Sequence, residues 1–324
     1  MSEISHFEEP DIVTSVHLYP IKSCHETTYN GEPITQLEVG PTGFQIGDVR
    51  DRGWVIDDGG VFVSQRGWDE CQALKYKEDR ILATVRVDIR DTHLHVSAQN
   101  HGELDIPLEF DGHEEGSVKI FGPELPVVYE SDDISEYYSS LLGRAVKLAK
   151  ADTSRPRVLP EKYCREGAAN RSAGADGRPF SFASQSSLDF LHDQAGIARG
   201  SLPITAYRAN VVIGGDQFGP FGEDYLRFVR IGKMGAHVVK ALSRCPIPNI
   251  NQETGDDSQR LSTKLTMTRR GWVVGDDVGS KPEPFFAQSL NHEYDDNQTI
   301  SVGQGDPVKA EEFSETPNVI LKVK

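Results

Sequence analysis

The 324-residue sequence has only four cysteines and no long apolar run. Cys24, Cys71, Cys164 and Cys245 lie far apart and form no CxxC pair, which argues against a zinc ribbon and against a disulfide scaffold. No stretch approaches the ~18 consecutive apolar residues of a membrane helix, and the acidic N-terminus lacks the apolar segment of a signal peptide. These absences predict a cytoplasmic protein with reduced thiols and no membrane span.

Basic residues are scarce relative to acidic ones. The sequence has 34 lysines and arginines against 50 aspartates and glutamates, which gives a formal net charge of −16. A protein that binds nucleic acid or an anionic membrane carries a clustered basic excess, and the sequence shows none. We therefore interpret the acidic residues mainly as a solubility feature and expect no nucleic-acid partner.

Length and strand patterning predict a β-rich α+β protein in two parts, because a compact domain holds roughly 100–200 residues. Short β-branched runs separated by turns indicate a curled, barrel-like antiparallel sheet in the first third. Capping residues predict one helix near 133–142, with Asp133 as its cap and Gly143 at its end, and a second begins near 184 or 186. Residues 151–180 are loop-rich. The strand signals cover 12–19, 54–63, 81–89, 94–97, 210–213, 226–231, 237–240 and 299–303.

Cys245 is the strongest candidate for a chemical role. The fixed charge of Arg244 beside it favours the thiolate, the form that ligates soft metals and attacks electrophiles. A single free cysteine is nevertheless more often a small buried hydrophobe. What supports a site is that polar residues stand where several predicted strands meet turns and could converge on an anionic ligand. These segments are Tyr19–Cys24, Asp51–Trp54, Ser64–Arg66, Tyr207–Asn210 and Ser243–Cys245.

The motifs resemble those of MOSC-domain proteins that carry the MOSC N-terminal β-barrel domain, in particular the mitochondrial amidoxime-reducing components. The resemblance runs from about residue 11 to 310 with the motifs in family order. It implies an N-terminal antiparallel β-barrel-like domain over 11–130, a MOSC β-barrel domain with a few helices over 131–310, and a tail over 311–324. The motifs are Tyr19-Pro-Ile-Lys-Ser-Cys24, Asp51-Arg52, Arg208-x-Asn210-Val-Val, Gly222-Glu-Asp-Tyr225, Ser243-Arg-Cys245, Glu253-Thr-Gly255 and Val302-Gly-x-Gly-Asp306-Pro-Val308.

The resemblance also implies a molybdenum cofactor (Mo-molybdopterin) and a role for each matching residue. Cys245 matches the molybdenum ligand, and Asp176 matches an acidic residue near the metal. The pterin and its phosphate would be held by Lys22, Ser23, Arg52, Arg208, Asn210 and Arg244, with Arg66 as a weaker candidate. Gly177 and Arg178 replace small hydroxyl residues of those relatives, so the substrate pocket is expected to differ. The sequence shows no membrane anchor, ferredoxin domain or pyridoxal-phosphate desulfurase domain.

Three functions are compatible with these residues. The first is a molybdenum oxidoreductase that removes oxygen from N-hydroxylated compounds (amidoximes, hydroxylamines or N-oxides). Its electrons would come from an external donor, which in the related enzymes is a b-type cytochrome with its reductase. The second is a non-catalytic carrier of molybdenum cofactor or of a persulfide on Cys245. The third is a thiol hydrolase using Cys245 with His192 or His237, although the histidines form no recognisable cluster.

Overall fold

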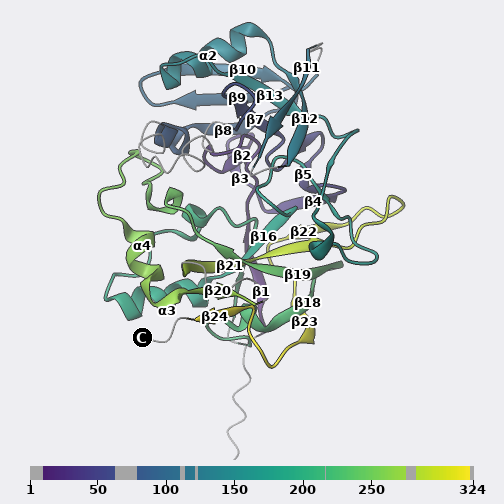
Figure 1. The fold of residues 1–324 in the computed structure, drawn as a ribbon, viewed down its shortest axis with the longest axis vertical. Helices are drawn as coiled ribbons and strands as arrows, with labels where there is room; N and C mark the ends of the chain where they lie inside the picture. The colour runs from purple at the N-terminus through teal and green to yellow at the C-terminus, as the bar shows by residue number, and fades with distance from the viewer. Residues whose placement is uncertain are drawn as a thin grey trace, which may run out of the picture.

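The computed structural model of this protein describes residues 10–62, 79–109, 114–120, 123–215, 217–274 and 282–321. It is strand-rich with few helices, and its curled sheets confirm the predicted β-rich α+β fold. Figure 1 shows most strands of the N-terminal part at the top of the view and the largest sheet, mainly from the C-terminal part, towards the bottom.

The N-terminal part is built from short strands in three sheets. The alternating burial of β9 and β12 explains why these runs form strands, since one face of each packs inward and the other meets solvent. The five-stranded sheet has the order β10 (Gly102–Pro107), β9 (His93–Ala98), β8 (Arg86–Ile89), β2 (Thr27–Tyr29) and β3 (Glu32–Pro33). The four-stranded sheets are β11 (Glu115–Lys119), β12 (Glu124–Tyr129), β13 (Lys147–Ala151), β7 (Trp54–Asp57), and β22 (Ser301–Gly303), β4 (Gln36–Gly40), β5 (Gly43–Ile46), β6 (Val49–Arg50).

The C-terminal part is organised by a nine-stranded sheet. Its central strands β16 and β21 are buried almost along their whole length, which is typical of strands covered on both faces. A separate pair joins β14 (Arg157–Val158) to β15 (Arg171–Ser172). The nine strands are β1 (Ile12–Val16), β17 (Val211–Gly214), β16 (Phe180–Ser184), β21 (Glu283–His292), β19 (Met234–Ser243), β18 (Leu226–Ile231), β23 (Val308–Phe313), β20 (Arg270–Val273) and β24 (Val319–Leu321).

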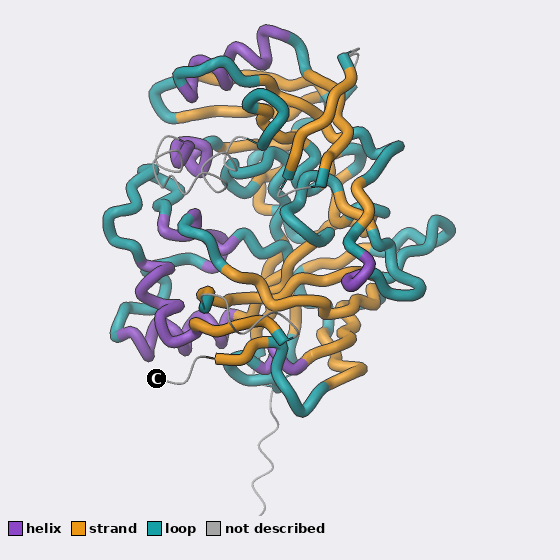
Figure 2. Tube along the Cα trace, in the orientation of Figure 1, coloured by secondary structure: helices purple, strands orange, loops and turns teal. Residues whose placement is uncertain are grey.

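The described α-helices are short, and Figure 2 draws them in purple together with the 3-10 turns. α2 (Asp132–Leu142) covers β13 and β10, whereas α3 (Gln185–Ala195) packs on β16, β17 and α4 (Leu261–Leu265). No helix in the described ranges has both the length and the apolarity that a bilayer crossing requires. The 3-10 turns are η2 (Arg80–Thr84), η3 (Glu161–Tyr163), η4 (Ile204–Tyr207), η5 (Gly222–Tyr225), η6 (Ile247–Asn249) and η7 (Thr266–Arg269).

Several strands cross between the two parts of the chain. β1 pairs with β17, so the first strand of the chain belongs to the C-terminal sheet. Conversely, β22 from the C-terminal part pairs with β4 in an N-terminal sheet. β13 lies beyond residue 130 yet pairs with β7 and β12. One hydrophobic core accordingly runs through both parts, and a second cluster lies under α3. The domain bounds 11–130 and 131–310 remain predictions.

Two of the differences between the local predictions and the structure have a clear physical reason. The run 81–89 was expected to be one strand, but its first half forms the 3-10 turn η2 and only Arg86–Ile89 is extended. Leu82, Ala83 and Thr84 are all buried there, so packing replaces the alternating burial of a half-exposed strand. The cap of α2 is Ser131 rather than Asp133, although Gly143 ends the helix in the left-handed conformation as predicted.

Candidate molybdenum-cofactor site

Three of the predicted site residues stand in turns with an unusual backbone conformation. Ser23, Arg52 and Arg208 have φ values of 74°, 51° and 56°, in the left-handed region that non-glycine residues seldom adopt. Arg52 immediately precedes the strand β7 region, and Arg208 ends η4 just before β17. Such outliers persist only where the surroundings enforce them, and they cluster at ligand sites. The backbone conformation of these turns therefore fixes the direction in which the three side chains leave the chain.

Arg52 and Arg208 converge on the ring of Tyr19. Their guanidinium carbons lie 4.9 and 4.3 Å from the ring centroid, within cation–π range. Arg52 Nη1 bonds the Asp51 carboxylate, and Arg52 Nη2 donates to the carbonyl of Arg208 at 3.1 Å. Arg208 Nη1 donates to the carbonyl of Cys24. Residues far apart in sequence are thus fixed as one basic cluster.

Asn210 is the buried hub of the same cluster. Its Oδ1 accepts hydrogen bonds from Arg52 Nη1 at 3.3 Å and from the backbone N–H of Ser181 at 3.1 Å. Its Nδ2 donates to the carbonyl of His17 at 3.2 Å. These bonds hold the Asn210 amide in place, so Asn210 helps to orient Arg52.

Lys22 is buried and pairs with an exposed carboxylate. Its Nζ contacts Asp176 Oδ1 and lies 4.8 Å from the centroid of the Phe62 ring. The Lys22 side chain is 6% exposed and that of Asp176 is 69% exposed. Burial lowers the pKa of Lys22, with Asp176 opposing the shift. Although the Asp176 side chain is exposed, the charges of Lys22, Arg52 and Arg157 hold the pKa of its carboxylate below the usual value.

Arg244 precedes the half-buried Cys245 and its charge acts on the thiol. Its Nε donates to the carbonyl of Phe286 at 2.7 Å and its Nη1 to the carbonyl of Tyr207 at 3.1 Å. Burial raises the pKa of the Cys245 thiol, and the charge of Asp176 adds to that rise while Arg244 opposes it. Arg244 thus favours the thiolate, as the sequence predicts, but desolvation outweighs its charge, and the net pKa of the thiol in the protein alone lies above its usual value.

The cluster holds more buried positive charge than its own carboxylates match. The cluster has five cations, namely Lys22, Arg52, Arg157, Arg208 and Arg244. Among the described residues, the carboxylates whose charges act on them are Asp51, Asp176 and, at Arg208, Glu26. Burial lowers the pKa of Arg208, and it lowers that of Arg244 to about 10. Their Nη2 atoms are buried and make no hydrogen bond to any described residue. Unpaired guanidinium N–H groups are costly unless an anion receives them, so the donor set fits a phosphate-bearing, thiolate-ligated cofactor.

The structure brings together most of the residues that the sequence predicts. The charge of Asp176 acts on Lys22, on Arg52 and on the Cys245 thiol, which places them in one electrostatic neighbourhood. Ser23 adjoins Lys22 in the same turn. Arg66 lies outside the described residues.

Arg157 was not predicted. It is buried and donates to Ser172 Oγ at 3.1 Å and to the carbonyl of Ala175. Its charge acts on both Lys22 and Asp176. The sequence places it in a loop-rich segment without a pattern, so only the fold reveals its position.

The two histidines considered for a hydrolase do not support that function. His192 is buried in α3, where Nδ1 bonds the carbonyl of Leu188 at 3.0 Å and Nε2 accepts the N–H of Leu202 at 3.4 Å. His237 packs edge-on against Phe228 at 4.8 Å. Within the described part of the chain no hydrogen bond joins either ring to Cys245, so the nucleophile–base pair that a thiol hydrolase needs is not formed.

Comparison with known proteins agrees with this arrangement. Residues 11–145 match the MOSC N-terminal beta barrel domain and residues 169–309 match the MOSC domain. A molybdenum cofactor sulfurase of Oryza sativa subsp. japonica is 24% identical over 305 residues, which cover 89% of this chain and 34% of that protein. Mitochondrial amidoxime-reducing component 1 is 26% identical over 257 residues in Mus musculus (78% of this chain, 69% of that protein) and 23% identical over 312 residues in Xenopus laevis (94% and 84%).

The chain spans about a third of the length of the sulfurases and most of the length of the amidoxime-reducing components. The two family matches together cover most of the chain. The cationic cluster contains residues of both, with Lys22 and Arg52 from the first match and Arg208 and Cys245 from the second. The chain therefore belongs to the MOSC-domain family, with a MOSC N-terminal beta barrel domain ahead of its MOSC domain.

Proposed function

We propose that this protein is a cytoplasmic, molybdenum-cofactor-dependent oxidoreductase that reduces N-hydroxylated compounds such as amidoximes, hydroxylamines and N-oxides. The observation that carries the proposal is the buried cationic cluster beside Cys245, in a protein whose net charge is −16. An acidic protein keeps such a cluster only where an anion compensates it. The similarity to amidoxime-reducing components supports the choice of substrate class.

The residues divide into those that bind and those that position. Lys22, Ser23, Arg208 and Arg244 would hold the phosphate and pterin, and Cys245 would ligate the metal as a thiolate. Arg52 would add charge while Asn210 and Asp51 keep it oriented. When bound, the cofactor supplies two-electron redox chemistry that these side chains lack. Ligation removes the thiol proton, which offsets the raised pKa of Cys245 in the protein alone.

The reaction needs protons as well as electrons. Cleavage of an N–O bond with release of water takes up two electrons and two protons. The neighbouring cations lower the pKa of Asp176 and so favour its charged form, which argues against Asp176 as the acid. We assign it to holding Lys22 in place, and protons would reach the substrate through water.

The electrons would come from an external donor, such as a b-type cytochrome with its reductase. The net charge of −16 repels an acidic donor at long range, so association with one would strengthen as ionic strength rises. A donor with a basic docking face would show the opposite dependence.

Purification from a host that makes molybdenum cofactor tests the proposal. We expect molybdenum and molybdopterin in equal amounts with the chain, and reduction of benzamidoxime or a hydroxylamine by a chemical electron donor. Cys245→Ser should lose activity, whereas Cys164→Ser, which changes another half-buried free cysteine, should keep it. Activity that survives growth on tungstate would overturn the proposal.

A carrier of cofactor or of persulfide sulfur is the second candidate, because sulfurases are among the relatives and Cys245 is only half-buried. Mass spectrometry of Cys245 together with metal analysis distinguishes the two. A mass gain of one sulfur without metal would indicate the sulfur carrier. Bound cofactor without turnover of any N-hydroxylated compound would indicate the cofactor carrier.

A further inference from the structure

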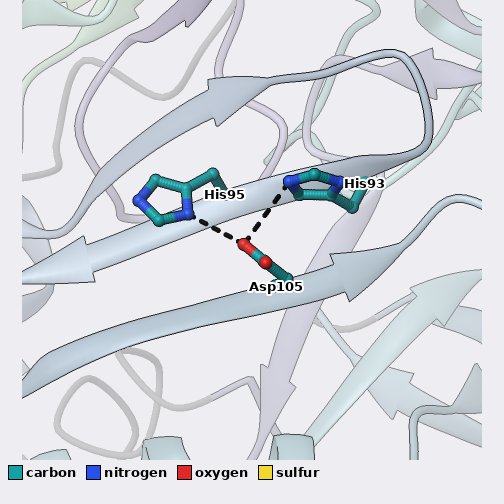
Figure 3. Close-up of side chains that lie close together, drawn as sticks. All are labelled: His93, His95 and Asp105. Atoms are coloured by element: carbon teal, nitrogen blue, oxygen red, sulfur yellow. Dashed lines mark hydrogen bonds and ion pairs between the residues drawn. The ribbon is translucent and has the colours of Figure 1, made fainter.

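Two histidines and an aspartate meet on the outer face of the N-terminal five-stranded sheet. His93 and His95 are two residues apart on β9, so both side chains lie on the same face. Asp105 on β10 is the direct cross-strand partner of His95. Figure 3 shows both imidazole rings turned toward the carboxylate of Asp105. The expectation that the histidines do not cluster is therefore wrong, because strand pairing joins positions that sequence spacing does not.

The three side chains present ligand atoms at metal-site spacing. His95 Nδ1 lies 2.8 Å and His93 Nε2 lies 3.5 Å from Asp105 Oδ1. All three ligand atoms lie within 4.8 Å of one another. A tetrahedral zinc ion with bonds of roughly 2.0–2.1 Å keeps its ligand atoms somewhat over 3 Å apart. Small side-chain rotations would bring the three atoms to that separation.

Each histidine also has its second ring nitrogen near an outer group. Thr92 Oγ1 lies 3.2 Å from His93 Nδ1, and Glu103 Oε2 lies 3.8 Å from His95 Nε2. Metal-bound imidazoles almost always have such a partner, which fixes the tautomer and raises the basicity of the ligating nitrogen. A surface ion pair between histidine and aspartate needs neither of these outer groups.

The site has room for further ligands and is separate from the cationic cluster. The histidine side chains are about one third exposed and Asp105 is 60% exposed. A surface hollow of about 450 Å³ borders the two histidines but not Asp105, and its walls are Asn30, Arg90, Asp91, Thr92, His93 and His95. Water or a small ligand can therefore complete the coordination of a bound ion, as in zinc sites with three protein ligands.

We propose that His93 Nε2, His95 Nδ1 and Asp105 Oδ1 form a binding site for a zinc-type divalent cation, linking β9 to β10. Two imidazoles and one carboxylate suit Zn²⁺ in charge and in ligand softness. Thr92 and Glu103 are its outer positioning residues. This site does not depend on the molybdenum cofactor or on Cys245.

Zinc titration of the chelator-treated full chain against a chromophoric zinc indicator tests the site. We expect one zinc equivalent that competes with the indicator. His95→Gln and Asp105→Asn should weaken binding by more than the roughly 10–100-fold typical of losing an outer partner, and Glu103→Gln by about tenfold. His101→Gln is the matched control. It lies in the same part of the chain, bonds the carbonyl of Tyr137 instead, and should bind zinc like the parent.

Cobalt substitution identifies the ligands and the geometry. Co²⁺ bound by nitrogen and oxygen in four-coordinate geometry gives an intense visible spectrum without the near-ultraviolet band of thiolate-to-cobalt charge transfer. A thiolate band that disappears in Cys245→Ser would show that the metal binds the cysteine, and would overturn the assignment. Equal zinc affinity in the parent and in Asp105→Asn, with both proteins folded by circular dichroism, would also overturn it.

Discussion

Lys22 shows how a single residue connects the fold to the proposed chemistry. It is buried, its pKa is lowered by that burial, and Asp176 is its principal counter-charge. A buried cation whose partner is removed costs free energy, because the remaining charge has neither water nor an ion pair. The stability of the empty protein should therefore depend on Asp176 more than its exposure suggests.

Asp176→Asn should lower the free energy of unfolding of the cofactor-free protein. The loss should fall between the ~1 kcal/mol of an exposed pair and the roughly 3–5 kcal/mol of a fully buried one, since only Lys22 is buried. Urea unfolding monitored by fluorescence measures it. The matched control is Asp193→Asn, which breaks the exposed pair with Arg199 and should lower the free energy of unfolding far less, because solvent screens that pair.

The same substitution should cost less in protein loaded with cofactor, because a bound anion would supply negative charge near Lys22. Equal losses in the loaded and empty proteins would show that Lys22 does not face the anion. That result would remove Lys22 from the proposed binding residues while leaving Cys245 and the arginines in place.

The residue scale also shows where sequence reasoning ends. The motif positions identify Lys22, Arg52, Arg208 and Cys245 because their types and order match a family. The pKa of Cys245 could not be predicted, since it depends on how burial competes with Arg244 and Asp176. Contacts that set these balances come from segments far apart in the chain.

At the scale of elements, capping and turn residues predicted more than apolar runs did. Gly143 ends α2 in the left-handed conformation as predicted, and α3 begins at Gln185, between the two predicted starts at 184 and 186. The 54–63 hairpin forms as β7 with a bridge between Asp57 and Phe62. The run 81–89 was ambiguous because a short apolar segment fits a buried turn as well as a strand.

The turn η5 carries a buried acidic pair that should make stability depend on pH. Glu223 Oε2 accepts a hydrogen bond from Ser187 at 2.8 Å, and Asp224 bonds Arg269 and Gln288. Burial and the charge of Asp224 raise the pKa of Glu223 to about 8. The folded state thus keeps a proton that the unfolded state releases above its ordinary pKa of 4.5.

Between pH 4.5 and 8 the contribution of Glu223 to stability should fall as pH rises, by about 1.4 kcal/mol per pH unit at most. Glu223→Gln removes this proton but keeps a group that can bond Ser187. The variant should gain stability relative to the parent as pH rises from 5 to 8. Urea midpoints measured across that range test it, and parallel curves for the two proteins would contradict it.

At the scale of the whole molecule, the two parts of the chain are interleaved rather than joined by a linker. Phe44 on β5 contacts Phe180 on β16 with ring centroids 4.6 Å apart, and Phe180 contacts His292 on β21 at 5.6 Å. The sequence predicted two parts but could not predict these pairings, because strand partners distant in sequence leave no local pattern. The cationic cluster lies across this junction, so its geometry requires both parts to be packed together.

His292 should report on that packing as a function of pH. It is fully buried, and its Nε2–H donates to the carbonyl of Gly40 at 2.8 Å, which joins β21 to β4. Burial lowers the pKa of His292 from 6.5 to about 4. The unfolded state therefore binds a proton below pH 6.5 that the folded state refuses until about pH 4. The stability that the neutral ring contributes is complete above pH 6.5 and is lost as pH falls through this window, by up to about 1.4 kcal/mol per pH unit.

His292→Gln keeps a donor for Gly40 and should lose less stability than the parent as pH falls from 6.5 to 4. Urea unfolding between pH 4 and 7 measures the difference between the two proteins.

The same unfolding curves test whether the two parts of the chain unfold together. If they do, tryptophan fluorescence and circular dichroism should report the same urea midpoint at each pH. Separate midpoints would show that the junction opens before the sheets unfold.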